Sequence, residues 1–505
     1  MTTVEHAGIQ LSAGPVAVAD VVRIAHGARL ELTAEAIERI EQSRAVVEQA
    51  LAGPTLVYGL NTGLGHLRNQ RLASEDLIAY QDAIIRSHTG GFGPPLATDV
   101  VRAAMAVRIV GIRRGGSGAS PAVATTLVAM LNAGVHPVVP TFGSVGASDL
   151  MHMAAIADVA LGRGSAELRG TVMPGGEALR AAGVDPLVLA PKDGLALVSA
   201  NGVSIGWGAL VVDDAARLVA AADTVLAVSL EAVGGNISII DPAVADAKGI
   251  DGQRATSEHL ARLLEGSQLC SRDTSSSVQD PLSFRVGPQV HGAAREFVAF
   301  LAKAVETELN AADDNPLVDV PGRRLVSNGN FQPVVLALSL DALRPALAHV
   351  GQLSDRRMNH LWEIAFRAPD SALASGIVRL TRHGRGMFHR YATAARYAHL
   401  RSIAGPASLD IGPLDNAVED HATNATEAAR LSAEALDTLA DVLAVELLMA
   451  RALLVAGDAR AKLGSGTMQV LDKLEEALAP IPEDAPSGEA VAATRQLLLG
   501  GLASA

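Results

Sequence analysis

The stretch Ala209–Leu230, ALVVDDAARLVAAADTVLAVSL, is the part of the sequence that decides the fold. Its alanine, leucine and valine residues recur at three- and four-residue spacing, which is the period of an apolar helix face. The same pattern returns in Val290–Leu309, Val334–Asn359 and Thr423–Leu454. Helices of this length exceed the usual three turns and are typical of a bundle whose ends carry the loops. The pattern therefore predicts a mainly α-helical protein with a long central helical bundle over residues 201–479.

The residues before and after the bundle have a different character. Residues 1–200 are predicted to form a loop-rich helical N-terminal domain, in which helices alternate with glycine-rich segments. One such segment, Gly53–Asn69, lacks periodicity and has the composition of a loop that carries a site. At the other end, the proline- and acid-rich stretch Pro480–Pro486 predicts that residues 480–505 form a hinge and a last short helix.

The composition excludes several classes of protein. Of the 505 residues, 49% are hydrophobic and 19% are charged, so the chain can bury a large core and is not disordered. The net charge of −13 argues against a nucleic-acid partner, because phosphate binding requires clustered Lys and Arg. The one cysteine, Cys270, excludes an internal disulfide and a Cys-rich metal site, and no spacing among the 14 histidines predicts a metal site.

The start of the chain predicts a cytoplasmic protein. The first residues, MTTVEHAGIQLSAG, have no basic region followed by an apolar core, so no secretory signal is visible. The high hydrophobic share comes without a long apolar run, which argues against membrane helices. It favours extra surface buried in an obligate oligomer.

Ten short blocks, rich in glycine and polar residues, follow one another between about residues 55 and 425. The blocks are Val57-Tyr58-Gly59-Leu60-Asn61-Thr62-Gly63-Leu64-Gly65, Arg86-Ser87-His88, Gly143-Ser144-Val145-Gly146-Ala147-Ser148-Asp149-Leu150, Val278-Gln279-Asp280-Pro281, Arg285, Pro288-Gln289-Val290-His291-Gly292, Glu308-Leu309-Asn310, Asp314-Asn315-Pro316-Leu317, Gly329-Asn330-Phe331 and Glu419-Asp420-His421. In this order and at this spacing they resemble the histidine/phenylalanine (aromatic amino acid) ammonia-lyase superfamily. Each block alone is weak evidence for the resemblance, but ten blocks in the order of the family do not arise by chance.

The resemblance implies a fold, an assembly and a reaction. The fold is the mainly α-helical ammonia-lyase fold of the fumarase/aspartase type, and the assembly is a homotetramer whose active sites are built from loops of three subunits. Members of this family remove an amine from Cα and a proton from Cβ of an amino acid, giving an aryl acrylate. Because ammonia leaves poorly, they capture the amine on a methylidene-imidazolone ring that the backbone makes from Ala-Ser-Gly. Glycine suits that compressed turn because it has no Cβ.

Three differences from the family pattern all concern the formation or use of this methylidene-imidazolone ring. Ala147-Ser148-Asp149 stands where the family reads Ala-Ser-Gly-Asp, so the glycine is deleted. Leu282 stands where the ammonia-lyases carry a tyrosine, and Asn330-Phe331-Gln332-Pro333 replaces a longer His-Gly-Glu type stretch. We therefore expect no cofactor, with the electrophile not made or else used differently. The alternative is a methylidene-imidazolone formed from Ala147-Ser148-Asp149 despite the bulk of Asp149.

Tyr58 resembles the family's general base for the Cβ proton. A tyrosine at its ordinary pKa is a poor base at neutral pH. The site must therefore lower the pKa of Tyr58 or supply a neighbouring cation. The alternative is an amphipathic tyrosine that packs within its loop.

Further site residues follow from the same resemblance. Arg285 resembles the arginine that holds the substrate carboxylate by a bidentate fork, and its alternative role is a structural ion pair with Asp280 or a similar residue. Asn201 and Asn330 would be amide partners of the substrate head group. The full set of candidates is Tyr58, Ser148 and Asp149 as catalytic residues, and Ser87, His88, Asn201, Gln279, Leu282, Arg285, Asn330, Phe331 and Glu419 as substrate-binding residues.

Ser87-His88 and Glu419 bear on the choice of substrate. In the family, the pair equivalent to Ser87-His88 separates imidazole users from phenyl and phenol users, and Ser-His is the histidine type. Glu419 likewise resembles the histidine enzymes. A histidine and a carboxylate can form hydrogen bonds with both nitrogens of an imidazole ring. A phenyl ring has no nitrogen that could take part in them. The alternative is a buried Glu–His pair within the bundle.

An enzyme without the electrophile needs a substrate with a better leaving group. A quaternary ammonium departs as a neutral amine and has no lone pair to add to a methylidene-imidazolone. Joined to an imidazole-type ring, this predicts elimination of trimethylamine from a histidine betaine such as ergothioneine or hercynine, giving thiol-urocanate or urocanate. Its cation should meet carboxylates, with Glu419 and Asp149 as candidates.

Other functions remain open on the sequence. The chain could be a histidine ammonia-lyase that makes the usual electrophile, or an aminomutase that moves the amine instead of releasing it. From another class, it could be a non-catalytic paralogue retained as a scaffold. Asp149 could equally be an ordinary N-cap of the helix that begins near Leu150.

Overall fold

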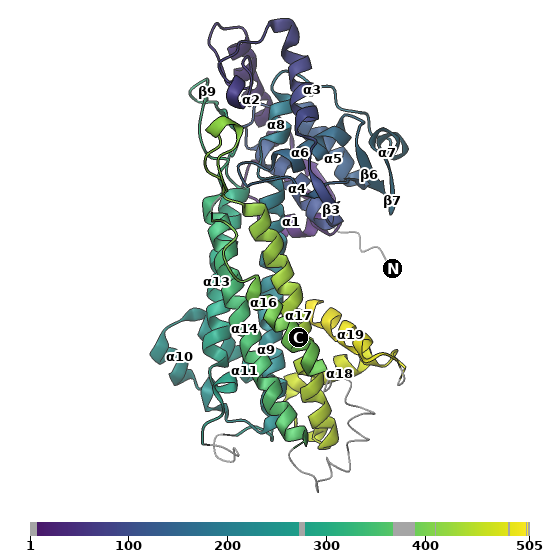
Figure 1. Ribbon diagram of the computed structural model, residues 1–505, viewed down its shortest axis with the longest axis vertical. Coiled ribbons are helices and arrows are strands. Elements are labelled where there is room, and N and C mark those ends of the chain that lie inside the picture. Colours follow the sequence, from purple (N-terminus) through teal and green to yellow (C-terminus); the bar gives the residue numbers. More distant parts are fainter. Residues whose placement is uncertain are drawn as a thin grey trace. The chain divides into compact units, whose positions relative to one another are not determined.

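The computed structural model of the chain describes residues 8–271, 278–366, 389–409, 411–482, 485–500 and 502 (Figure 1). These residues form two units, each made from three stretches of sequence. Unit 1 comprises Met1–Leu210, Leu301–Leu340 and Pro406–Arg430, and unit 2 comprises Val211–Phe300, Asp341–Gly405 and Leu431–Ala505. Residues 483–484 of the predicted C-terminal hinge lie outside the described residues.

Four long helices have residues in both units: α9 (Gly202–Val233), α13 (Gly287–Leu309), α14 (Val334–Phe366) and α17 (Ala425–Ala456). They contain the four long periodic stretches of the sequence, apart from Thr423 and Asn424 just before α17. The predicted mainly α-helical fold is therefore confirmed.

The other helices of unit 1 are shorter than these four, and unit 1 also contains several small sheets. Its other helical elements are α1 (Val18–Ala25), α2 (Ala34–Leu51), η1 (Gly65–Leu67), η2 (Ser74–Asp76), α3 (Leu77–His88), α4 (Thr98–Arg113), α5 (Pro121–Ala133), α6 (Leu150–Ala160), α7 (Gly175–Ala182), α8 (Asp193–Val198) and the turn η5 (Asp415–Ala417). Its strands are β1 (Ile9–Leu11), β2 (Leu30–Leu32), β3 (Phe92–Pro95), β4 (Val135–Pro137), β5 (Pro140–Phe142), β6 (Ser165–Leu168), β7 (Thr171–Pro174), β8 (Leu317–Asp319) and β9 (Arg324–Val326).

The strands pair in four small sheets. β1 pairs with β2 in parallel, with Ile9 opposite Leu30, and α1 forms the connection between them. β3 pairs with β5, and β8 with β9, both antiparallel. β4, β6 and β7 form a three-stranded antiparallel sheet. With strands of three or four residues, these sheets are too short to form a core of their own.

Two groups of helices build the interior of unit 1. α4 packs between α1 and α5, and α3, α6 and α8 pack against one another (Figure 1). Every residue of α4 from Val100 to Arg113 is buried, including Arg108, which binds the carboxylate of Asp314 through Nη2 at 2.8 Å. This buried ion pair fixes the segment after α13 against α4, because an unpaired charge there would be strongly unfavourable.

Unit 2 is a helical bundle whose long helices are joined by buried polar groups. Beside its parts of the long helices it contains η3 (Ile237–Ile240), α10 (Pro242–Lys248), α11 (Asp251–Leu263), α12 (Leu282–Arg285), α16 (Arg390–Ser402), η6 (Arg460–Lys462), α18 (Ser465–Leu478) and α19 (Ser487–Leu499). Glu446 of α17 accepts hydrogen bonds from Ser229 of α9 at 2.7 Å and from Arg357 of α14 at 2.5 and 2.9 Å. All three side chains are fully buried, so this ion pair specifies how α9, α14 and α17 pack.

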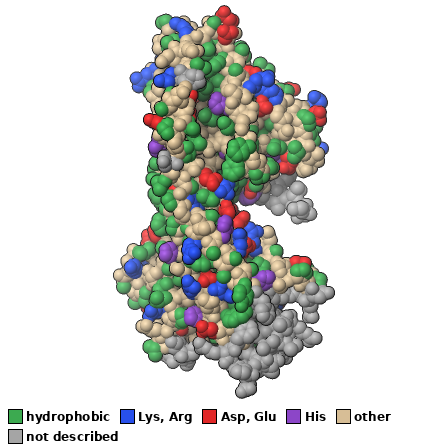
Figure 2. All heavy atoms as spheres, in the orientation of Figure 1, with side chains coloured by type: hydrophobic (Ala, Val, Ile, Leu, Met, Phe, Trp, Pro, Cys, Tyr) green, Lys and Arg blue, Asp and Glu red, His purple; other side chains and the backbone are tan. Residues whose placement is uncertain are grey.

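Two helical segments are long and apolar enough to cross a membrane by length and composition alone. They are Asp193–Val233 and Val334–Ala365, and 94% and 61% of their most apolar windows are buried inside the protein. That burial is typical of the core helices of a bundle. On the face that Figure 2 shows, Lys and Arg side chains are interspersed with Asp and Glu side chains.

Candidate active site

The loop that carries Tyr58 is held by its own polar side chains. Asn61 Oδ1 accepts the N–H of Val57 at 2.7 Å, and Asn61 Nδ2 donates to the carbonyl of Thr55 at 2.9 Å. Gly59 has a positive φ of 64°, and a Cβ at this position would overlap the side chain of Leu195. The glycine-rich sequence is therefore required for a tight turn that packs on α8.

Two tyrosine hydroxyls receive hydrogen bonds from consecutive backbone amides. Gly65 N donates to Tyr58 Oη at 3.2 Å, and Leu64 N donates to Tyr80 Oη at 2.8 Å. Burial is the largest influence on Tyr58 and raises its pKa, while the amide of Gly65 lowers it and the charges of Glu419, Tyr80 and Asp415 raise it. The net pKa of Tyr58 lies above its ordinary value. The described part of this chain therefore does not supply the lowered pKa that a base requires at neutral pH.

Ser87 and His88 lie at the end of α3. His88 Nδ1 lies 2.7 Å from the carbonyl oxygen of Ile84, which can only accept, so Nδ1 carries the proton. In the neutral ring, Nε2 is then a hydrogen-bond acceptor. Ser87 Oγ donates to the same carbonyl at 3.0 Å. Burial and the charge of Asp415 raise the pKa of Glu419 above its ordinary value, and a positive charge on the nearby His88 would oppose this shift.

Asp149 is held by four hydrogen bonds inside unit 1. Its Oδ1 accepts from Ser144 Oγ at 2.7 Å, Ser204 Oγ at 2.8 Å and Thr426 Oγ1 at 2.8 Å, and its Oδ2 accepts from Ser204 N at 2.7 Å. The side chain is fully buried, and its residue precedes α6. Asp149 therefore anchors the segment between α6, α9 and α17, and the structure does not bring it to the cavity described below.

The backbone around Ser148 is also fixed. Ser148 has a positive φ of 59°, which costs a non-glycine residue about 1 kcal/mol. Its N–H donates to the carbonyl of Phe331 at 3.1 Å, and the N–H of Asp149 donates to the carbonyl of Ala200 at 2.8 Å.

These contacts bear on the backbone-made ring of the family. Ring closure needs the nitrogen of the third residue to attack the carbonyl carbon of the first, here Asp149 and Ala147. That nitrogen already donates to the carbonyl of Ala200, and the side chain of Asp149 is fully buried and held by Ser144, Ser204 and Thr426. The segment therefore does not fit the arrangement that ring formation requires.

A cavity of about 620 Å³ in unit 1 collects most of the candidate residues. It is lined by Tyr58, Leu64, Gly65, Leu67, Tyr80, Ala83, Ile84, Ser87, His88, Ala147, Ser148, Leu150, Met151, Leu195, Ser199, Asn315, Phe331, Asp415 and Glu419. A smaller neighbouring cavity of about 280 Å³ shares six lining residues with it: His88, Ala147, Ser148, Leu150, Met151 and Glu419. The structure thus brings Tyr58, Ser87, His88, Ser148, Phe331 and Glu419 together.

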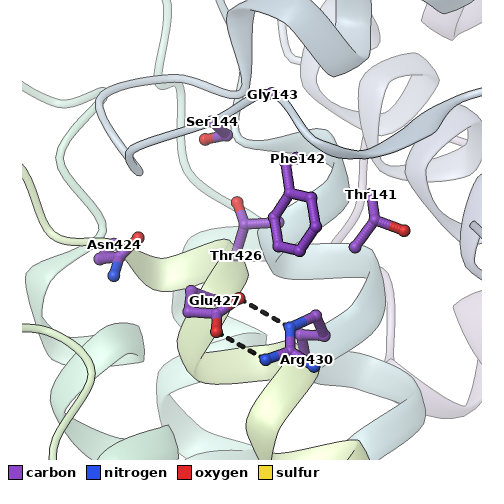
Figure 3. A pocket seen from close by; sticks show the side chains of 8 residues that line it. All are labelled: Thr141, Phe142, Gly143, Ser144, Asn424, Thr426, Glu427 and Arg430. Atoms are coloured by element: carbon purple, nitrogen blue, oxygen red, sulfur yellow. Dashed lines mark hydrogen bonds and ion pairs between the residues drawn. The ribbon is translucent and has the colours of Figure 1, made fainter. Parts of the chain in front are cut away.

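A third hollow, of about 210 Å³, is lined by residues 141–144 and by Asn424, Thr426, Glu427 and Arg430 (Figure 3). Ser144 and Thr426, which both hold Asp149, line it. Its acidic residue, Glu427, is paired with Arg430 by two hydrogen bonds of 2.7 Å, drawn as dashed lines in Figure 3. The charges of this hollow are therefore balanced within one turn of α17.

The two asparagines predicted to bind the substrate head group, Asn201 and Asn330, differ in exposure. Asn201 is 1% exposed, and its side-chain Oδ1 and Nδ2 have no hydrogen-bond partner among the described residues. Its backbone N–H donates to Asp313 Oδ2 at 2.9 Å. Asn330 is exposed, and its Nδ2 donates to the carbonyl of Ala312 at 3.2 Å. Neither side chain lines the 620 Å³ cavity in this chain.

Three further candidate residues belong to unit 2: Gln279, Leu282 and Arg285. Arg285 Nη1 donates to Gln279 Oε1, and Leu282 is 59% exposed. Among the described residues Arg285 contacts Gln279, while Asp280 Oδ2 accepts from the N–H of Asn236 at 2.6 Å. Their proposed contact with substrate stays a prediction.

Sequence reasoning missed Tyr80 and Asp415 as cavity residues. Tyr80, Ile84 and His88 are spaced by four residues on α3, so they share one face of that helix. That spacing could have identified Tyr80 once His88 was a candidate. Asp415 precedes Glu419 by four residues in a loop, where no such periodicity applies. Within the described residues, no group of three or more His, Cys, Asp and Glu side chains could hold a metal ion.

Comparison with known proteins identifies the class. The sequence matches the aromatic amino acid lyase family over residues 16–476. The chain belongs to this family, whose members are carbon–nitrogen lyases, within the histidine/phenylalanine ammonia-lyase superfamily that the motifs predicted.

Three similar proteins illustrate the range within the family. A probable histidine ammonia-lyase of Halobacterium salinarum is 37% identical, over 97% of this chain and 95% of its own. Among solved structures, the ergothioneine-degrading enzyme ergothionase of Treponema denticola, in complex with desmethyl-ergothioneine sulfonic acid, has a TM-score of 0.90 at 26% identity. That match covers 99% of this chain and all of the other. Histidine ammonia-lyase of Trypanosoma cruzi has a TM-score of 0.87 at 28% identity, covering 98% and 94%.

Proposed function

We propose that this lyase eliminates trimethylamine from a histidine betaine, with ergothioneine the favoured substrate, and that it acts without a methylidene-imidazolone. The observation that carries the proposal is the position of Asp149. Where ring closure needs a free amide and no side chain, this chain has a buried carboxylate held by four hydrogen bonds. The similarity to ergothionase supports the same reaction.

The state of Tyr58 supports a cationic substrate. The pKa of Tyr58 is raised by burial and by the carboxylates of Glu419 and Asp415. A base in this position needs a positive charge beside it before it can ionise. Among the described lining residues of the cavity there is no Lys or Arg. A quaternary ammonium would bring that charge with the substrate.

The ring-binding groups favour a ring with two N–H donors. His88 Nε2 is an acceptor in the neutral ring, since Nδ1 donates to Ile84. An ionised Glu419 is an acceptor as well. The thione form of the ergothioneine ring presents two N–H groups, whereas the neutral imidazole of hercynine presents one. This is why ergothioneine is the favoured substrate of the two.

The reaction then runs as a simple 1,2-elimination. Ionised Tyr58 takes the Cβ proton, the C–H electron pair forms the Cα–Cβ double bond, and the Cα–N bond breaks with its electrons on nitrogen. Neutral trimethylamine and thiol-urocanate are released, and Tyr58 returns its proton to solvent. On the family resemblance, Arg285 with Gln279 holds the substrate carboxylate, while Asn201 and Asn330 bind the head group. We also propose a cytoplasmic homotetramer.

A histidine ammonia-lyase is the second candidate, because relatives with that name are 37% and 36% identical. The aminomutases among the similar structures make amine migration a third. The mass of the intact protein separates the first two. An unmodified mass agrees with the proposal, whereas a mass lower by two waters demonstrates the ring.

The activity assay completes the test. Trimethylamine released from ergothioneine by the wild type, and not by Tyr58→Phe, is the expected result. Ammonia from histidine, or an isomeric β-amino acid, would establish one of the other functions instead. Absence of trimethylamine from both ergothioneine and hercynine would refute the proposal.

A further inference from the structure

We propose that the 280 Å³ cavity, with Met151 on its wall, receives the sulfur atom at position 2 of the substrate ring and thereby selects a thione. This inference rests on the function proposed above and names the subsite that recognises the ring substituent. It concerns a part of the ring that histidine and hercynine do not carry.

The two cavities of the site adjoin at the groups proposed to bind the ring. Six residues line both of them, and these include His88 and Glu419. Tyr58, the proposed base, lines the larger cavity and is not among the residues that line the smaller one. The carbons that react must therefore lie in the larger cavity. The ring, which contacts His88 and Glu419, then lies where the two cavities adjoin.

The geometry of the ring directs the sulfur away from the base. The two N–H groups of an imidazole-2-thione flank the carbon that carries the sulfur. When His88 Nε2 and the carboxylate of Glu419 accept these two N–H groups, the C=S bond points between the two acceptors. The reacting side chain is attached at the opposite edge of the ring. With that side chain beside Tyr58 in the larger cavity, the sulfur is directed into the smaller one.

The wall of the smaller cavity suits a sulfur atom. Five of the residues that line it alone have no polar side chain, and the sixth, Ser144, donates its hydroxyl proton to Asp149 Oδ1 at 2.7 Å. Phe92 of β3 and Phe142 of β5 lie opposite each other, with ring centroids 5.7 Å apart. Sulfur is polarisable and makes favourable contacts with aromatic rings, whereas a carbonyl oxygen in an apolar wall loses its hydrogen bonds to water. The cavity should therefore prefer sulfur to oxygen.

Met151 is the residue through which this preference can be tested. It lies in the first turn of α6, lines both cavities and is 37% exposed. A Cβ built on Gly90 would lie 3.8 Å from both Sδ and Cε of Met151, so the thioether lies beside the segment that follows His88. A thioether is soft and apolar, and it offers no hydrogen-bond donor to the ring substituent.

The test compares two ligands that differ in one atom. Ergothioneine and its 2-oxo analogue, an imidazol-2-one, share the quaternary ammonium group, the carboxylate and both ring N–H groups. Their equilibrium affinities are measured by calorimetry in a Tyr58→Phe background, which prevents turnover. We expect ergothioneine to bind about 10- to 100-fold more tightly than the oxygen analogue. Equal affinities, or tighter binding of the oxygen analogue, would overturn the inference.

Three variants in the same background locate the preference. Met151→Gln introduces an amide that can donate to the oxygen, and it should reduce the preference for sulfur about 10-fold or more. Met151→Leu keeps the apolar wall and should retain most of the preference. Met173→Ala is the control, because this partly buried methionine belongs to β7 and lines neither cavity. An unchanged preference in Met151→Gln would contradict the placement of the sulfur beside Met151.

Failure of the subsite and failure of the proposed function give different results. Release of trimethylamine from ergothioneine by the wild type, without a preference for sulfur over oxygen in binding, would overturn the subsite alone. A preference for sulfur that Met151→Gln reduces, without release of trimethylamine, would overturn the proposed reaction and support the subsite.

Discussion

Replacing Asp149 tests whether this residue anchors the fold or acts in the reaction. Its carboxylate is fully buried and accepts four hydrogen bonds, three on Oδ1 from hydroxyls and one on Oδ2 from the N–H of Ser204. Asp149→Ala removes all four and leaves the backbone donor of Ser204 unsatisfied in the interior. Hydrogen bonds to a charged group contribute about 1.5–3 kcal/mol each, but they are not additive. We expect a loss of about 3–5 kcal/mol in the free energy of unfolding.

Asp149→Asn provides a graded version of the same change. Its carbonyl oxygen can stay at the Oδ2 position and keep the bond from Ser204 N. Its NH₂ group then faces Ser144, Ser204 and Thr426, whose hydroxyls can turn and accept. The expected loss is about 1–2 kcal/mol, clearly smaller than for alanine.

Urea unfolding at fixed protein concentration measures both variants against the wild type. Asp420→Ala, on the exposed loop, should change stability by less than about 0.5 kcal/mol and serves as the control. The reasoning is refuted if Asp149→Ala unfolds at the wild-type urea concentration while losing affinity for ergothioneine. That result would show that Asp149 binds the substrate and does not stabilise the fold.

Three other predictions follow from titratable groups. Tyr58→Phe should lower the rate of trimethylamine release at least about 100-fold while ergothioneine binding changes little, as single-turnover and binding measurements will show. Because the pKa of Tyr58 is raised and the base must be ionised, kcat/KM should increase with pH through the neutral and alkaline range, measured as a pH–rate profile. Burial raises the pKa of Glu308 to about 7 and, with the charge of Asp314, that of Asp313 to about 6. A carboxyl with a raised folded-state pKa holds its proton more tightly when folded, so stability should fall as pH rises from about 4 to 7. Glu308→Gln should flatten that fall in urea unfolding at a series of pH values, and an unchanged slope would contradict it.

The helical fold could be predicted because its signal is repeated along the chain. Periodic apolar stretches such as Ala209–Leu230 form the buried faces of the long helices. A three- and four-residue period over such a length is typical of a helix and does not fit a strand. The family of the protein followed from ten motifs in order. The division into two units, each made of three separate stretches, depends on contacts between residues far apart in the chain, which periodicity does not encode.

The site was predictable where a motif fixes a local structure. Tyr58, Ser87, His88, Ser148 and Glu419 do line one cavity. Asp149 illustrates the limit, since the same sequence position is compatible with a substrate contact and with a buried anchor. Only the partners Ser144, Ser204 and Thr426, from three separate segments, distinguish the two roles. Asp415 was missed because it lies in a turn where three consecutive residues without a glycine, 415–417, have a positive φ. The sequence of this loop does not predict such a conformation.

The carboxylates that line the cavity have a consequence for product release in the proposed reaction. There the substrate would enter as a cation at its amine end, and the amine that leaves would be neutral. The acrylate that remains would lack the positive charge and keep only its negative carboxylate. On this proposal the product is a weaker ligand than the substrate, because the cavity is lined by carboxylates and, among its described lining residues, by no Lys or Arg. Inhibition by accumulated thiol-urocanate should accordingly be weak.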